Sequence, residues 1–136
     1  MPEDVIRTLT TAHYSILETV DRLQLNIRNY PKAKPLIREL HQKLMAHFSH
    51  QNEPFFMALQ AQCGQARESL KMLEFLQFDL KEIKVNLLVF FDRHSGEMDD
   101  IHFRSFPKDF TDLSGLIIGR IKMEKDYLIP ILQKCN

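Results

Sequence analysis

Five polar residues interrupt the apolar stripes that otherwise run through the helical segments of this sequence. They are His13, His47, Gln51, Arg120 and Glu124. Inward imidazoles and carboxylates from facing helices are the ligands with which helical bundles hold metal ions. Charged side chains are almost never fully buried unless they are paired. The five residues therefore predict a shared polar site inside the fold, with or without a metal.

Arg120 and Glu124 lie one helical turn apart in the segment RIKMEKDYLIP. Arginine cannot be deprotonated in a protein and so cannot ligate a metal, and its charge opposes a nearby cation. Its planar fork can instead donate to a carboxylate. One interpretation is that Arg120 replaces a metal and neutralises Glu124, with Gln51 and both histidines completing a polar network. The other is that a metal is held by His13, His47, Gln51 and Glu124.

Four further residues are weaker candidates for metal ligands. His50 and Glu53 flank the second helical motif and would reach the site only if that helix were rotated or kinked, so we interpret both first as surface residues. Pro54 removes a backbone donor there, and some bending is expected. Glu74 and Asp79 lie near the right depth but off the apolar stripe of their segment.

Prolines and glycines divide the chain into four segments with helical periodicity. The breaks fall at residues 29–35, at Cys63–Gly64 and from Ser95 to Pro107, where Pro107 suits the first turn of the last helix. Between them, apolar residues recur at steps of three and four. We predict an all-α fold, an up-down-up-down antiparallel four-helix bundle that forms one domain over residues 1–136. In that arrangement His13, His47 and Glu124 fall at matching depths.

The motifs around these residues resemble those of the hemerythrin-like (HHE cation-binding) family. His13 in TAHYSILETVDRL is similar to the first motif, and LMAHFSHQNEPFFMAL matches the second with Gln51 in place of a glutamate. RIKMEKDYLIPIL matches the last, with Arg120 in place of a histidine. The third segment offers no histidine at the required depth. The resemblance covers nearly the whole chain and implies a bundle around a non-haem di-iron centre.

The departures from that family pattern favour a degenerate di-iron site, with no cofactor, in a non-catalytic regulatory or partner-binding protein. The alternative is a non-haem iron protein that binds or senses dioxygen, nitric oxide or redox state through His13, His47 and Glu124. A further alternative rests on the AHFS-like second motif and the RxxxE pattern of the last helix. These are similar to the Rsd/AlgQ family of anti-sigma regulators, which bind a sigma factor.

Composition restricts the partners of the chain. Eighteen basic and eighteen acidic residues among 136 cancel, so non-specific nucleic-acid binding is disfavoured. No apolar run is long enough to span a membrane and no signal peptide is visible, so we expect a cytoplasmic protein. Cys63 and Cys135 have no metal-knuckle spacing and are expected to be reduced thiols, with a single disulfide between them as the alternative.

The third segment is apolar around much of its circumference. It contains the run Val85–Phe91, with Phe75 and Phe78 upstream. A helix that is apolar on two faces is either central or covered by a partner. We therefore expect a protein partner or a homodimer to use this helix. The alternative is that the long connection before the last helix folds back over it, with Phe103, Phe106 and Phe110 as the cover. No nucleophile–base pair or phosphate-binding loop is visible, so the sequence does not indicate an enzyme.

Overall fold

The computed structural model describes residues 2–94 and 100–135, and side chains at 3–94 and 103–135. All regular secondary structure in these ranges is helical, which confirms the all-α prediction. The elements are α1 (Pro2–Leu25), α2 (Tyr30–Ser49), α3 (Glu53–Cys63), α4 (Arg67–His94), α5 (Asp100–Met123), the π-helical turn η1 (Glu124–Leu128) and α6 (Ile129–Lys134).

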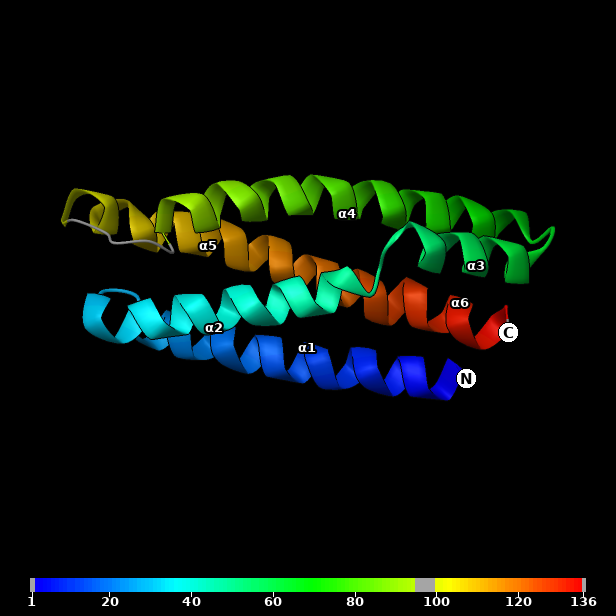
Figure 1. The fold of residues 1–136 in the computed structure, drawn as a ribbon, viewed down its shortest axis with the longest axis horizontal. Helices are drawn as coiled ribbons and strands as arrows, with labels where there is room; N and C mark the ends of the chain where they lie inside the picture. The colour runs from blue at the N-terminus through cyan, green and yellow to red at the C-terminus, as the bar shows by residue number, and fades with distance from the viewer. Residues whose placement is uncertain (1, 95–99, 136) are drawn as a thin grey trace.

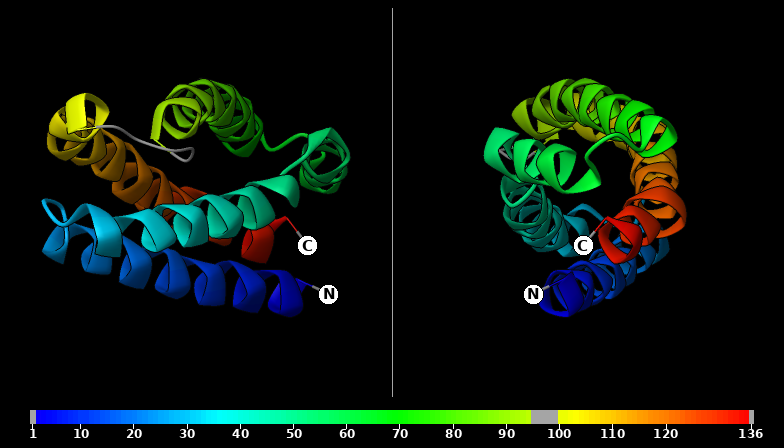
Figure 2. Two further views of the ribbon diagram at one scale, coloured as in Figure 1. Left: turned by 60° about the vertical axis from the view of Figure 1, so that its left-hand side comes forward. Right: turned by 90° about the vertical axis from the view of Figure 1, so that its right-hand side faces the viewer.

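The helices lie side by side along the long axis of the molecule and form a helical bundle (Figure 1). α1 packs mainly on α2, and α4 packs mainly on α5. α3 lies against α4 and α6, and α6 also contacts α1. Seen along the bundle, the helices surround a common interior (Figure 2). Both termini lie at the end where α3 meets α4 (Figure 1). None of the helices in the described ranges combines the length and hydropathy needed to cross a membrane.

The interior is filled by aliphatic and aromatic side chains from the inward stripes of the helices. α1 contributes Ile16 and Leu23, both fully buried, and α4 contributes Leu73 and Leu76. At residues 90–110 the core becomes aromatic, with Phe90, Phe106 and Phe110 in contact. Burial of these stripes is the main force that holds the helices together, at roughly 25 cal/mol per Å² of apolar surface.

The second predicted helix is two helices. α2 ends at Ser49, and α3 begins at Glu53 with Asn52 as its N-cap, where the Asn52 side chain accepts from Phe55 N. The physical reason is Pro54, whose ring would clash with the carbonyl of His50 in a continuous helix and which has no N–H to donate. Asparagine stabilises the new helix start by accepting from an otherwise unpaired amide.

The predicted start of the last helix was wrong. α5 begins at Asp100, so Pro107 lies inside this helix and does not mark its first turn. The part of the expected connection from 95 to 99 lies outside the described residues. Further along, Ile129 N donates to Glu124 O across five residues, which closes the wide turn η1. This turn ends two residues before Pro130, whose ring would clash with the carbonyl of Asp126 in a regular α-helix.

The two cysteines form a disulfide, which corrects the expectation of reduced thiols. Cys63 ends α3 and Cys135 follows α6, and the two helices lie against each other. Their Cα atoms are 4.6 Å apart, within the range that a disulfide spans. The sequence separation of 72 residues hid this proximity, because only the packing of α3 on α6 creates it.

Reduction of this disulfide is expected to destabilise the protein, because the bridge restricts the unfolded chain over a long loop. We predict a loss of about 2–4 kcal/mol in the free energy of unfolding, measured by urea denaturation with and without reductant. The Cys63→Ser, Cys135→Ser double variant should show the lower stability and no response to reductant. Two titratable thiols in protein denatured without reductant would contradict the prediction.

Candidate functional site

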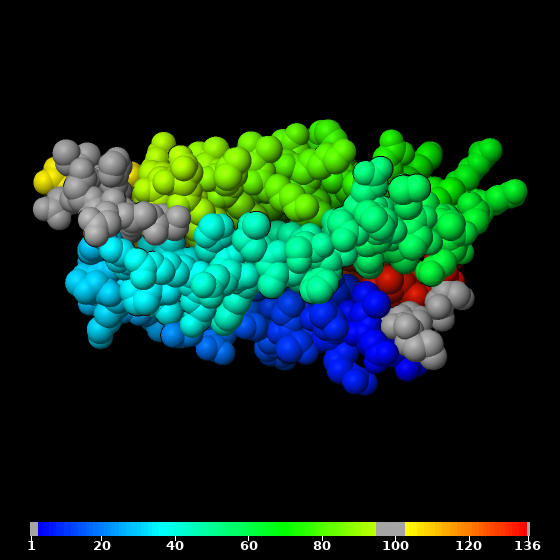
Figure 3. Space-filling view, in the orientation of Figure 1, coloured from blue at the N-terminus to red at the C-terminus, as the bar shows by residue number. Residues whose placement is uncertain are grey.

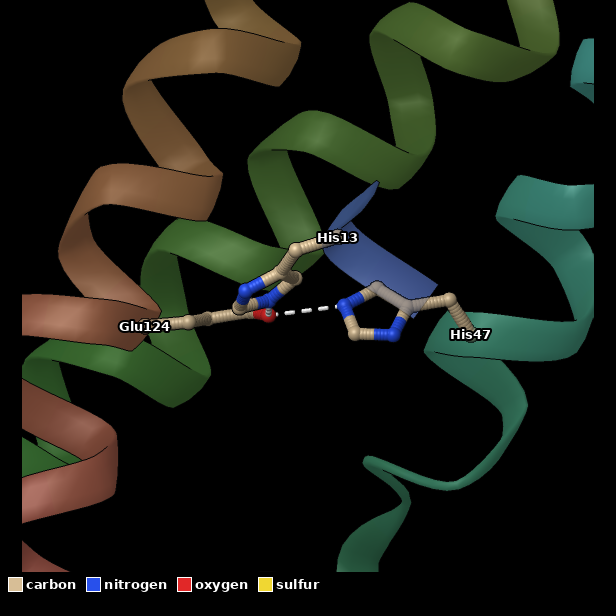
Figure 4. Close-up of side chains that lie close together, drawn as sticks. All are labelled: His13, His47 and Glu124. Carbon is tan, nitrogen blue, oxygen red and sulfur yellow. Dashed lines mark hydrogen bonds and ion pairs between the residues drawn. The ribbon is translucent and has the colours of Figure 1, made fainter. Parts of the chain in front are cut away.

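The Glu124 carboxylate lies at the centre of a buried hydrogen-bonded network. Oε1 accepts from Nε2 of His13 and from Nε2 of His47, each at 2.7 Å (Figure 4). Oε2 accepts from Arg120 Nε at 2.8 Å and from Gln51 Nε2 at 3.0 Å. A carboxylate offers about four acceptor positions, and here four donors use them. Glu124 is thus completely paired at zero solvent exposure.

Arg120 connects this carboxylate to three other groups. Its Nη2 donates to Gln51 Oε1 at 2.8 Å, and its Nη1 donates to the backbone carbonyl of Leu76 at 2.8 Å and to Asp79 Oδ2 at 3.1 Å. The side chain is 1% exposed. Gln51 therefore donates to Glu124 and accepts from Arg120 at the same time. Charge-assisted bonds of this kind are about twice as strong as neutral ones.

Each member of the network comes from a different part of the bundle. His13 lies on α1, His47 near the end of α2, and Gln51 in the break between α2 and α3. Arg120 is in the last turn of α5, and Glu124 opens η1. The structure brings together all five residues of the predicted polar network. Gln51 reaches the network from the irregular stretch that joins α2 and α3.

The electrostatics of the network keep Glu124 ionised. Burial alone would raise its pKa, but the hydrogen bonds from His13 and His47 and the charges of His47 and Arg120 lower the pKa well below its usual range. Because a carboxylate oxygen can only accept, each Nε2 that contacts Oε1 carries its proton in this arrangement. A ring nitrogen that carries a proton has no lone pair available to a metal.

His13, His47 and Glu124 nevertheless form a group that could hold a cation. One ligand atom from each lies within 4.8 Å of the others, and all three residues are buried. Binding would require both Nε2 atoms to give up their protons, either to solvent or to Nδ1 of the same ring, and would break both hydrogen bonds to Oε1. It would also place a cation close to the Arg120 guanidinium, which contacts the other oxygen of the same carboxylate. The donor set therefore fits the arginine better than a metal.

The four weaker candidates divide into two groups. His50, Glu53 and Glu74 are exposed, and none of them hydrogen-bonds to the network in the described part of the chain. Asp79 is half-buried and pairs with Arg120 rather than with the histidines. Its acidic side chain lies off the main stripe of α4 but close enough for the long arginine to reach.

Two contacts had no clear signal in the sequence. The Leu76 carbonyl belongs to an apolar residue, so its role as an acceptor depends only on the approach of α5 to α4. The second is a group of bonds between α1 and α2. Thr19 and Lys43 donate to the half-buried Glu39, and the Lys43 ammonium lies 2.7 Å from Thr19 Oγ1. These bonds join α1 to α2 and lower the pKa of Glu39, with the Thr19 hydroxyl as the largest cause. They fix the two helices that carry His13 and His47.

Comparisons with protein-family models, with curated proteins and with solved structures gave no match for this chain. The geometry of the site is therefore the basis for any proposal on function.

Replacing Arg120 by methionine is predicted to destabilise the protein by about 3–5 kcal/mol, because it leaves the Glu124 charge buried without its cation. Urea denaturation would measure this loss. Arg93→Met is the matched control: Arg93 is exposed and pairs with Asp109 at the surface, so it should cost about 1 kcal/mol or less. Adding Glu124→Leu to Arg120→Met should recover part of the loss. Equal effects of Arg120→Met and Arg93→Met would contradict the buried pairing.

Acid should remove the contribution of Glu124 to stability. Its pKa is lowered on folding, so its contribution is fully present above the ordinary carboxyl pKa near 4.5 and declines as the pH falls toward the lower folded value. Urea denaturation from pH 7 to pH 3 is the measurement. The stability difference between the wild type and Glu124→Gln should be constant above that pKa and shrink below it. A difference that does not change with pH would show that Glu124 does not titrate as described.

Proposed function

We propose that this protein is a non-catalytic regulatory or partner-binding bundle of the hemerythrin-like type, in which a guanidinium stands where the family holds iron. The observation that carries the proposal is the buried Arg120, whose Nε donates to Glu124 Oε2 at 2.8 Å. It supplies the positive charge that a buried carboxylate needs, and it does so without a metal. The polar core then serves to fix one arrangement of the helices.

The order of the helices supports the hemerythrin-like, up-down-up-down form of the bundle. α1 packs on α2 and α4 packs on α5, and α3 and α6 extend α2 and α5 beyond their local irregularities. With these extensions counted, consecutive helical rods run along the same axis in alternating directions (Figure 1). The inward positions of His13, His47 and Glu124 support the same family.

A regulatory role of this kind needs a protein partner. The resemblance of the second and last motifs to the Rsd/AlgQ family suggests a sigma factor as one class to test. The exposed apolar side chains Phe75 and Phe78 in the first half of α4 offer a surface for protein binding. A purified sigma factor that fails to bind in a direct titration would exclude that class while leaving other partners open.

The second candidate function is a mononuclear non-haem iron protein that responds to dioxygen, nitric oxide or redox state. The cluster of His13, His47 and Glu124 supports it, because the three ligand atoms converge. Two histidines and one carboxylate are a ligand set known for iron(II). Bound iron would supply redox and gas-binding chemistry, while this chain would provide the ligands and a buried site around them.

Metal analysis separates the two candidates. Protein purified from iron-supplemented cells is predicted to contain far less than one iron per chain and to lack the absorption bands of oxo-bridged ferric ions. There are two physical reasons. Both Nε2 atoms carry protons where iron would bind, and the Arg120 charge already neutralises Glu124 and repels a cation. Stoichiometric iron that survives removal of loosely bound metal would overturn the first candidate and support the second.

Restoring the family residues should create iron affinity if the site is a degenerate metal centre. Arg120→His combined with Gln51→Glu adds an imidazole and a carboxylate and removes the opposing charge. We predict tighter iron binding than in the wild type, measured by equilibrium titration with iron(II) under anaerobic conditions. The matched control is Arg93→His with Gln24→Glu, the same substitutions at exposed positions. Equal affinity in both double variants would argue against the proposed ancestry of the site.

A further inference from the structure

The outer face shared by α2 and α4 carries an apolar groove next to exposed apolar side chains. The groove has a volume of about 550 Å³, and its floor includes Leu44, Phe48 and Leu87, all nearly buried. At its rim Met45 is 61% exposed and Leu88 is 71% exposed. Figure 3 shows the face on which α2 and α4 lie next to each other. Isolated exposed apolar residues are common, but a groove flanked by several indicates a binding surface.

The charges at the rim of this groove are arranged symmetrically. Lys84 and Asp92 both line it, and they lie four residues before and four residues after Leu88. At 1.5 Å per residue each is displaced by about 6 Å along the helix from Leu88, in opposite directions. Both side chains are exposed, and neither makes an ion pair within residues 3–94 and 103–135. Two opposite charges without a partner in that part of the chain thus flank one exposed leucine.

We propose that this face binds a second copy of the same chain in an antiparallel, two-fold symmetric dimer centred on Leu88. A two-fold interface is formed by the same patch of both copies. If one residue of the first copy faces a second residue of the other copy, the second residue of the first copy also faces the first residue of the other copy. With the axis at the level of Leu88, each Lys84 faces Asp92 of the other copy, and the two leucines meet. Both ion pairs then form at the edge of the buried apolar area.

Other occupants fit these observations less well. A parallel two-fold pair of α4 helices would place Lys84 against Lys84 and Asp92 against Asp92, which like-charge repulsion disfavours. A partner helix of another protein would need its own acidic and basic residues at matching positions, whereas a second copy has them already. Val85, 62% exposed and next to the groove on α4, extends the apolar area that such a dimer would cover.

The test is sedimentation equilibrium of the full chain over a concentration series. The wild type should fit a monomer–dimer equilibrium. Leu88→Asp should be monomeric, whereas Tyr14→Asp, at an exposed position on α1, should dimerise like the wild type. Circular dichroism would confirm that each variant is folded. A wild type that stays monomeric at every concentration would overturn the proposal, even if Leu88→Asp abolished binding of a different protein.

Charge reversal tests the antiparallel register. Lys84→Asp and Asp92→Lys should each weaken dimerisation by about tenfold or more, because each replaces two attractive pairs with repulsive ones. The double variant should recover most of the wild-type affinity. An equimolar mixture of the two single variants should form a heterodimer that is tighter than either homodimer, since both cross pairs are then attractive. Single variants that dimerise like the wild type, or no recovery in the double variant and the mixture, would refute the register.

The dimer does not depend on the function proposed for the core. Leu88, Lys84 and Asp92 lie outside the buried network, so their variants should leave the iron content and the stability contribution of Arg120 unchanged. Failure of the dimer test would therefore leave the pairing of Arg120 with Glu124 intact, and stoichiometric iron would leave the dimer intact.

Discussion

The pairing of Arg120 with Glu124 is the constraint on which the interior of this bundle depends. A carboxylate with no solvent exposure is tolerated only when its charge is balanced and its lone pairs are bonded. Arg120 meets the first condition, and together with His13, His47 and Gln51 it meets the second. Because these donors come from separate helices, the carboxylate can be satisfied only when the helices are in register.

Two irregularities of the backbone lie at this network. Gln51 occupies the break between α2 and α3, and Glu124 opens the π-helical turn that precedes Pro130. In both cases a proline removes a backbone donor and forces the chain out of the regular helix. π-Turns inside helices often mark functional positions, and here the turn begins at the buried carboxylate. The prolines thus shape the local backbone at two of the points that hold the network.

The same buried residues can serve either as metal ligands or as members of a structural hydrogen-bonded network. His13, His47 and Glu124 have the types and the proximity of a metal site. Arg120 favours structural pairing over metal binding. A guanidinium is always charged and donates through several N–H groups, whereas a neutral histidine in its place would have one N–H donor and one nitrogen free to bind a metal. The outer face of α4 is independent of this choice, because Lys84, Leu88 and Asp92 are exposed and lie outside the buried network.

The sequence by itself determined the helical class. It also predicted the inward positions of the five network residues, with the pairing of Arg120 and Glu124 as one of two interpretations of them. These properties follow from local periodicity and from the rule that a buried charge needs a partner, both of which can be applied to a linear chain. Only the tertiary structure decided the contact of Arg120 with the Leu76 carbonyl, the start of α5 before Pro107 and the disulfide between Cys63 and Cys135. The contact and the disulfide depend on how distant helices approach one another, and composition and spacing contain no information on that approach. The start of α5 depends on residues before Pro107 that continue the helix despite the proline, which a local breaker signal does not reveal.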